Sequence, residues 1–278
     1  MSFDNVRGLR SSISNVLATN VCSGRPRRAP TVDPMSELEL LILAAVAIGT
    51  STMSGVVGFG GGVVLLAVLL IFFPPLQAIP IHGAIQIASN SSRAFVTRDH
   101  IDRTIVWNHL ALMVPASVLG LLAASALPVS AGRALIGVFV LVATWKPAWI
   151  TPQLERPLPP RAFLGVGAVQ GFLNIPLGAT GPLITPFFRV SLTGRQAFVA
   201  TFAAAQTFGH IVKVGVFAFD GFDYHDHVAT IAVGAVAVTL GSMIGTRLLG
   251  RVSERAFRVI FLTVITAIAI RLILRAIL

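Results

Sequence analysis

The glycine-rich stretch GVVGFGGG occupies residues 55–62, inside an apolar segment that covers residues 37–73. The stretch NIPLGATGP, at residues 174–182, interrupts a second apolar segment that covers residues 162–188. A glycine costs a helix about 1 kcal/mol relative to alanine, and a proline removes a backbone hydrogen-bond donor. We therefore predict that the helix breaks inside both segments.

The chain is too apolar to be a soluble domain. Of its 278 residues 55% are hydrophobic and 12% are charged, and the mean hydropathy is +0.83. A soluble domain usually carries about 25% charged residues. Apolar runs of the length that spans a bilayer recur from residue 37 to the end of the chain. We expect an all-α, polytopic bundle of transmembrane helices.

The net charge of +10 does not indicate nucleic-acid binding. The arginines lie in the polar tail, residues 1–35, and in short hinges between apolar runs, which is the placement of topology signals. We expect the tail to be disordered, and Met35 is a second candidate for the start of translation. The one cysteine, Cys22, lies in this tail, so neither an intrachain disulfide nor a thiol metal site is predicted. We expect no cofactor and no metal.

The two halves of the chain match at an offset of about 120 residues, which predicts tandem repeats. The first repeat covers residues 36–150, a proline-rich linker covers 151–160, and the second repeat covers 161–278. Matched pairs of residues are Gly62 with Gly181, Gln86 with Gln206, Arg93 with Lys213, Asp99 with Asp220, and Asp102 with Asp223. The predicted segments are 37–73, 77–96, 108–127 and 130–149, then 162–188, 194–219, 225–249 and 255–274.

The relative orientation of the repeats depends on how often each one crosses the bilayer. Four crossings each, about eight transmembrane segments in all, would make the repeats parallel. However, the loop after the second segment carries Arg98 and Arg103 in the first repeat, whereas the corresponding loop of the second repeat carries acids and neither Lys nor Arg. Because positive charge marks the cytoplasmic side, we favour inverted repeats and keep the parallel arrangement as the alternative.

A helix that breaks inside a bilayer exposes backbone groups, which is tolerated only inside protein or beside a watery cavity. The N-terminal ends of half-helices carry a partial positive charge and bind anions, and paired breaks mark the binding site in many transporters. The alternative is that the glycines only let helices pack closely.

Polar side chains form a stripe on one otherwise apolar helix. His82, Gln86, Asn90 and Arg93 share one helical face, and Gln206, His210 and Lys213 repeat the pattern in the second half. Such side chains at membrane depth usually face a cavity. The alternative is that Arg93 and Lys213 reach toward the headgroups while the amides bond neighbouring helices.

All eleven acidic residues lie in tails, hinges or segment ends, so the groups at depth are cationic or hydrogen-bond donors. This lining predicts a site for a small anion, and His82 and His210 are the candidates for proton coupling. The predicted substrate-binding residues are Gly60, Gly61, Gly62, Gln86, Asn90, Arg93, Gly178, Thr180, Gly181, Gln206, His210 and Lys213.

The glycine run, its partner GATGP at residues 178–182, the duplicated plan and the Gln86/Gln206 pair resemble the TauE/SafE family of sulfite and organosulfur-anion transporters. The resemblance covers residues 36–275 and implies a multi-pass permease of the bacterial inner (plasma) membrane that moves sulfite, sulfonates or related anions. The glycine motifs of the family correspond here to Gly58, Gly60, Gly61, Gly62, Gly178 and Gly181. Asn174, Pro176 and Thr180 depart from a plain glycine run.

We expect a secondary transporter that works by alternating access at the interface of the two repeats. The alternatives are a passive anion channel and an accessory membrane subunit that does not transport. An enzyme is not predicted, because no segment offers a serine with a histidine and an aspartate at membrane depth. The expected partners are the small anion and the lipid bilayer, and a homodimer is one arrangement that the sequence leaves open.

Overall fold

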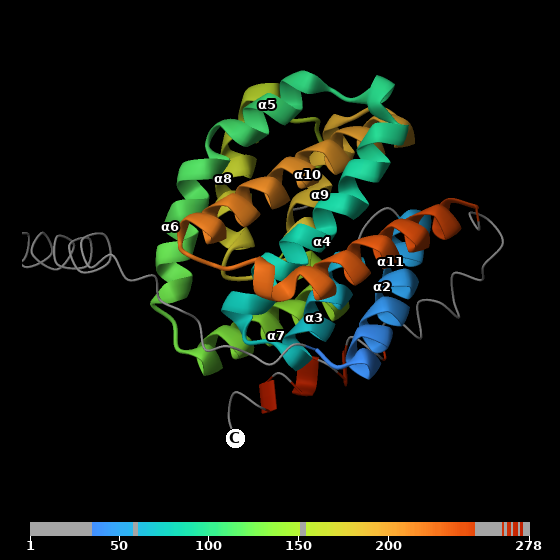
Figure 1. The fold of residues 1–278 in the computed structure, drawn as a ribbon. Helices are drawn as coiled ribbons and strands as arrows, with labels where there is room; N and C mark the ends of the chain where they lie inside the picture. Colours follow the sequence, from blue (N-terminus) through green and yellow to red (C-terminus); the bar gives the residue numbers. More distant parts are fainter. Residues whose placement is uncertain are drawn as a thin grey trace, which may run out of the picture. The chain divides into compact units, whose positions relative to one another are not determined.

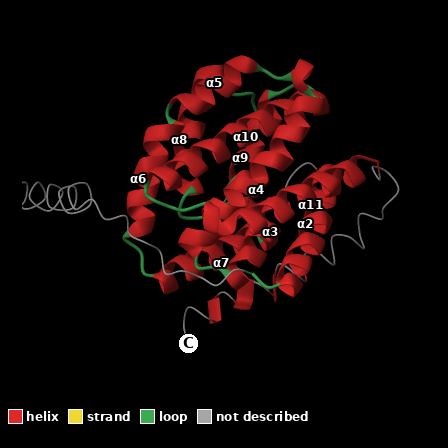
Figure 2. Cartoon of the chain, in the orientation of Figure 1, coloured by secondary structure: helices red, strands yellow, loops and turns green. Residues whose placement is uncertain are grey.

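The described chain is helical throughout. The computed structural model describes residues 35–57, 61–150 and 154–247, with isolated positions between 263 and 274, and within these residues no strand occurs (Figure 2). These residues belong to one compact unit, Val32–Leu278. The predicted all-α class is confirmed for the described residues. The predicted tail, Gly58, Gly60 and most of the segment 255–274 lie outside them.

The helices follow the predicted segments closely, and each glycine-rich segment forms two helices. The first half contains α2 (Glu37–Val57), α3 (Gly61–Phe72), α4 (Pro75–Val96), α5 (Arg103–Ala111), α6 (Met113–Ser125) and α7 (Val129–Trp145). The second half contains α8 (Phe163–Asn174), α9 (Gly181–Ser191), α10 (Arg195–Phe219) and α11 (Val228–Arg247) (Figure 1). Short 3₁₀ turns lie at Arg98–His100, Pro147–Trp149, Pro160–Ala162 and His225–His227.

Local sequence explains where several helices begin. The Ser36 N–H donates to Glu39 Oε2 at 2.8 Å, and the Glu39 N–H donates to Ser36 Oγ at 3.4 Å, which is a reciprocal cap at the start of α2. Asp102 caps α5 by accepting the Ile105 N–H at 3.0 Å. These caps supply partners for backbone donors that the first turn of a helix leaves free.

The predicted break in the second half is present. Helix α8 ends at Asn174, α9 begins at Gly181, and between them Gly178 has φ +75°, a left-handed conformation that favours glycine. In the first half, α2 ends at Val57 and α3 begins at Gly61. With 12 and 11 residues, α3 and α9 are each roughly 17 Å long, about half the hydrocarbon thickness of a bilayer.

A further interruption was not predicted. The segment expected over residues 108–127 is divided into α5 and α6, whose axes bend by 41° at Leu112. Pro115 explains this bend, because a proline has no N–H to donate and its ring collides with the carbonyl group four residues earlier, at Ala111.

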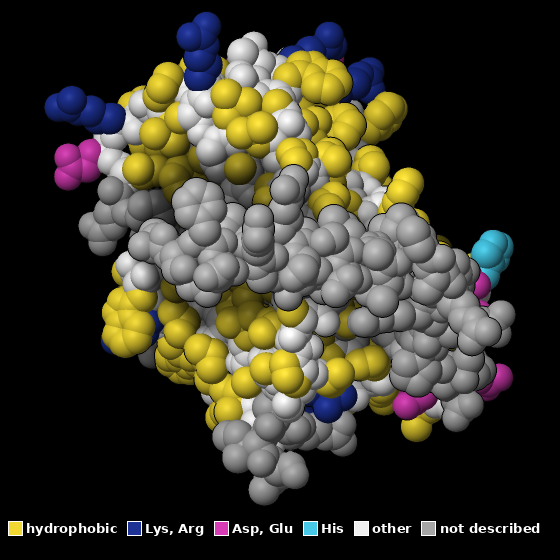
Figure 3. All heavy atoms as spheres, turned by 90° about the vertical axis from the view of Figure 1, so that its left-hand side faces the viewer, with side chains coloured by type: hydrophobic (Ala, Val, Ile, Leu, Met, Phe, Trp, Pro, Cys, Tyr) yellow, Lys and Arg dark blue, Asp and Glu magenta, His cyan; other side chains and the backbone are white. Residues whose placement is uncertain are grey.

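Two described helices are long and apolar enough to cross a membrane by themselves, Arg195–Phe219 and the stretch His225–Gly245. A third crossing results if the bent pair α5 and α6 is one span. Many large apolar side chains face outward, including Phe219 at 99% and Val96 at 81% exposure. Hydrophobic side chains cover much of the described surface visible in Figure 3. Such a surface suits lipid, not water.

Helices of one half pack on helices of the other. Helix α11 lies along α2, α5 and α6 lie along α8, and α4 crosses α10 (Figure 1). Glycines at two of these crossings leave no room for a β-carbon. Gly241 and Gly245 of α11 abut the carbonyls of Ile48 and Thr52. Gly167 of α8 abuts the carbonyl of His109 in the same way. Backbones without side chains between them pack closely, as small residues allow in membranes.

Replacing Gly167 by alanine should destabilise the protein, because the new β-carbon would overlap the His109 carbonyl oxygen, a backbone atom that cannot rotate away. Overpacking of this kind costs about 1–3 kcal/mol. The matched control is Gly165→Ala on the same helix, where a β-carbon meets nothing within 4 Å. Thermal unfolding in detergent should show a lower melting temperature for Gly167→Ala only. Equal melting temperatures would contradict the close crossing of α5 and α8.

Candidate functional site

A cavity lies where α3 begins, between α4, the break before α9, and α10. It measures about 50 Å³, counted as the space open to the centres of water molecules, and about 10–15 Å³ suffices for one water. There is room for a compact oxyanion. The lining residues are Gly62, Val63, His82, Gln86, Asn90, Arg93, Ala179, Thr180, Gly181, Pro182, Phe202, Gln206 and His210.

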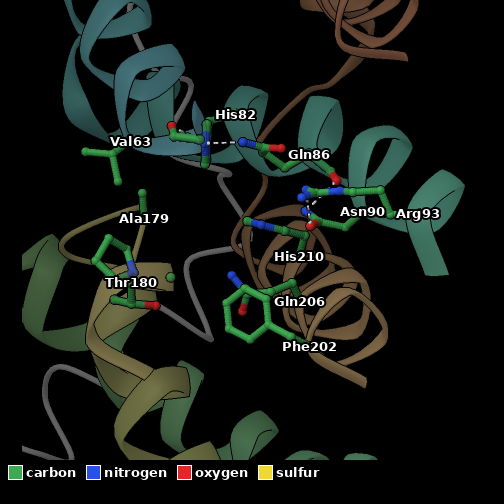
Figure 4. Close-up of a pocket in the computed structure, with 13 residues that line it drawn as sticks. Val63, His82, Gln86, Asn90, Arg93, Ala179, Thr180, Phe202, Gln206 and His210 are labelled. Atoms are coloured by element: carbon green, nitrogen blue, oxygen red, sulfur yellow. Dashed lines mark hydrogen bonds between the residues drawn. The ribbon is translucent and has the colours of Figure 1, made fainter. Parts of the chain in front are cut away.

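Helix α4 supplies the first wall. His82, Gln86, Asn90 and Arg93 stand in a row along it, as the helical spacing predicted (Figure 4). His82 Nε2 donates to the carbonyl oxygen of Gly62 at 2.9 Å. Arg93 Nη2 donates to Asn90 Oδ1 at 2.8 Å, and Asn90 Nδ2 donates to the Gln86 carbonyl at 2.9 Å. These bonds hold the polar row in one conformation.

The break before α9 and helix α10 supply the opposite wall. Thr180 is 1% exposed, and its hydroxyl donates to Asn174 Oδ1 at 3.4 Å. Gln206 and His210 point from α10 into the same space (Figure 4). Gly62, in the first turn of α3, and Gly181, the first residue of α9, both line the cavity. Two helix N-termini, with their partial positive charge, therefore open on one cavity.

Each of these glycines has a glutamine amide beside it. A β-carbon at Gly62 would overlap Gln86 Nε2, and one at Gly181 would lie 3.4 Å from Gln206 Nε2. The sequence matched Gly62 with Gly181 and Gln86 with Gln206. The structure brings both pairs together in the same way.

The charge of the cavity is positive. Among the described residues, its lining holds Arg93 and no acidic residue. Within the described part of the chain, the one ion pair joins Arg98 to Asp99, at 4.0 Å and on the exposed loop after α4. Arg93 and Lys213 therefore have no carboxylate partner among those residues. A buried cation without a counter-ion favours an anion as ligand.

Lys213 lies outside the lining, although the sequence placed it with the binding residues. It is 0% exposed, and its Nζ donates to the carbonyl oxygen of Gly178 at 2.7 Å. Its aliphatic stem passes Gly83 of α4, where a β-carbon would lie 2.8 Å from Lys213 Cε. The ammonium group thus lies in the break between α8 and α9. Its part in substrate binding stays a prediction.

His82 and His210 face each other from α4 and α10. Their ring centroids are 5.6 Å apart with the ring planes at 78°. The Nδ1 atoms of both rings are buried and have no hydrogen-bond partner among the described residues. The structure thus brings together the two histidines that were predicted as candidates for proton coupling. Within the same residues, no group of three or more His, Cys, Asp or Glu is placed to hold a metal.

Comparison with known families decides between the classes of membrane protein. A family model described as "Sulfite exporter TauE/SafE" matches residues 41–272. The chain belongs to the TauE/SafE family. No curated protein and no solved structure matches it.

Membership of the TauE/SafE family has three consequences for this chain. It implies an integral membrane protein, and it implies a transporter of sulfite- or sulfonate-type anions. Members of the family are transporters and not enzymes, which supports the non-enzymatic interpretation. The acid-free cavity agrees with an anionic substrate.

Two buried side chains beside the cavity, His109 and Gln170, were not predicted from the sequence. Gln170 of α8 donates from Nε2 to Gln206 Oε1, and its own Oε1 lies 2.6 Å from His109 Nε2 on α5. The available signal was a polar residue inside each of two apolar segments. No spacing rule linked them, because the contact joins residues 61 positions apart.

The burial of Lys213 predicts that it resists small amine reagents. The chain has two lysines, and Lys146 is exposed. Reductive methylation of the folded protein, followed by mass spectrometry, should modify Lys146 and leave Lys213 unmodified, because its ammonium is held by Gly178. Methylation after unfolding should modify both. Equal modification of the two lysines in the folded protein would place Lys213 on an open, water-filled surface instead.

Proposed function

We propose that this TauE/SafE protein is a multi-pass secondary transporter of the bacterial inner membrane. Its substrate is a small anion: sulfite, a sulfonate or another organosulfur oxyanion. The anion binds in the cavity between α4, α10 and the starts of α3 and α9. The observation that carries the proposal is this cavity, which is lined by hydrogen-bond donors and one arginine and contains no acid.

The proposed ligands are the predicted site residues that line the cavity. Arg93 offers the fixed charge, and Gln86, Gln206 and Asn90 offer amide groups. Thr180 and the first turns of α3 and α9 offer hydroxyl and backbone groups. A wall formed by Val63, Ala179 and Phe202 is apolar, which suits the carbon side of a sulfonate. Lys213 and Gly178 lie outside the lining, and the hydrogen bond between them stabilises the break before α9.

We further propose two inverted repeats, residues 36–150 and 161–278, joined by the linker 151–160. The matching Gly62–Gln86 and Gly181–Gln206 contacts support the repeat, and the opposite charges of the two corresponding loops support its inversion. The packing between the halves is also reciprocal. Helix α11 of the second half lies on α2 of the first, and α5 and α6 of the first half lie on α8 of the second. Inversion needs an odd number of crossings per repeat, which results if each broken pair is a helical hairpin that begins and ends on one side of the membrane.

The position of the cavity between α4 and α10, which belong to different repeats, supports alternating access. Rocking one repeat against the other would open the cavity to each side in turn. If a proton moves with the anion, His82 or His210 carries it, since these are the histidines in the lining. A passive channel remains the second candidate, and an accessory subunit that does not transport is the third.

Proteoliposomes containing the purified protein should take up ³⁵S-labelled sulfite faster when they are preloaded with unlabelled sulfite. Only a carrier shows such counterflow. Arg93→Gln should reduce the apparent affinity for sulfite at least about tenfold, because a hydrogen bond to a charged group contributes about 1.5–3 kcal/mol. Arg98→Gln is the matched control, because Arg98 is exposed on the loop just beyond α4 and should change the affinity by less than about twofold.

Three results would count against the proposal. Uptake without counterflow would favour a channel, and no uptake of any sulfur oxyanion would favour an accessory subunit. Equal affinities for the two arginine variants would remove Arg93 from the site. Thermal unfolding of both variants verifies that each is folded.

A further inference from the structure

Three buried polar side chains form a hydrogen-bonded line that ends at the cavity. His109 on α5 is 0% exposed, Gln170 on α8 is 2% exposed, and Gln206 on α10 is 8% exposed. His109 Nε2 lies 2.6 Å from Gln170 Oε1, and Gln170 Nε2 donates to Gln206 Oε1. Only Gln206 lines the cavity.

The orientation of the Gln170 amide gives this line its direction. Its oxygen faces His109 and its NH₂ group faces Gln206, and because an amide oxygen can only accept, the His109 ring donates from Nε2. Gln170 then has only its NH₂ group left to offer to Gln206. The Gln206 oxygen is thereby occupied, and its NH₂ group faces Gly181 at the start of α9. Reversing the line would turn the Gln206 oxygen toward the cavity and repel an anion.

Packing holds the line in place. The backbone of His109 abuts Gly167, which lies three residues before Gln170 on α8. The His109 ring stands edge-on to Phe188 at 5.3 Å. A β-carbon at Gly209 of α10 would lie 3.4 Å from Gln170 Nε2, so α10 also lies against the amide. These contacts keep the His109 ring and the Gln170 amide next to each other.

We propose that His109 and Gln170 are positioning residues that make Gln206 an obligatory hydrogen-bond donor to the transported anion. The inference rests on the proposed function, since it concerns the same cavity. His109 and Gln170 do not line the cavity, and they act only through Gln206. The face of the substrate toward Gln206 is therefore an unprotonated oxygen.

Gln86, the counterpart of Gln206 in the first half, has no such line behind it. Its Nε2 lies 3.3 Å from His82 Nε2, but His82 Nε2 carries the hydrogen that it donates to Gly62 and cannot accept from Gln86. Among the described residues, two side chains stand behind the Gln206 amide. We expect the side of the cavity formed by Gln206 and Gly181 to contribute more to anion affinity than the side formed by Gln86.

Binding of ³⁵S-labelled sulfite to the purified, detergent-solubilised protein tests the inference. His109→Phe keeps a ring beside Phe188 but removes the donor, and should weaken binding about tenfold. His109→Gln restores an N–H donor at nearly the same reach and should bind within about twofold of the wild type. Ser117→Ala is the control, because Ser117 bonds the Gly171 carbonyl at the same helix crossing but lies outside the line.

A double-mutant cycle separates positioning from a general structural role. In a Gln206→Met background, His109→Phe should have less than about a twofold further effect, because its action passes through Gln206. Gln170→Met should behave as His109→Phe does, which provides a second variant if the first is not folded. Full additivity of His109→Phe and Gln206→Met, or failure of His109→Gln to restore binding, would overturn the inference.

Different results would contradict the proposed function and the inference about His109. If the wild type does not bind sulfite, the proposed function fails for this substrate and the inference fails with it. If the wild type binds, and Arg93→Gln weakens binding while His109→Phe does not, only the inference fails.

Discussion

The central constraint is that lipid offers no hydrogen bonds, so every backbone group exposed by a broken helix needs a partner in the protein or in a cavity. Near each break one described carbonyl oxygen accepts from a side chain. His82 donates to Gly62, and Lys213 donates to Gly178. Helix N-termini, amide NH₂ groups and Arg93 face the cavity (Figure 4). The positive bias of the site follows from these donors and not from a large number of charges.

The same constraint explains the glycines at the helix crossings. Short helices such as α3 and α9 are tolerated only when other helices surround them, and α3 is buried along most of its length. Close crossings of α2 with α11 and of α5 with α8 enclose the breaks, and they depend on Gly241, Gly245 and Gly167. Glycine therefore has two separate roles in this chain. It permits the turn at Gly178, and elsewhere it brings backbones together.

Much of the architecture could be predicted from the sequence, because apolar length and helical spacing are local properties. The segments, the break before Gly181 and the polar row on α4 were all predicted. The repeat matched Gly62 with Gly181 and Gln86 with Gln206, but the contact of each glycine with its glutamine was not predicted. The bend at Leu112 was missed because the proline that causes it lies inside an apolar run. The Lys213 side chain takes its path because Gly83, which has no side chain, leaves room for it. The hydrogen bond between His109 and Gln170 forms because two helices meet there. Neither is encoded in spacing along one helix.

The most direct measurement is the position of a heavy substrate analogue bound to the protein. Selenite resembles sulfite in shape and charge, and its selenium can be located by anomalous scattering in crystals of the complex. The account predicts one strong selenium peak inside the cavity, within hydrogen-bonding reach of Arg93, Gln206 and Thr180. A peak at the exposed arginines of the loops, with the cavity empty, would contradict it.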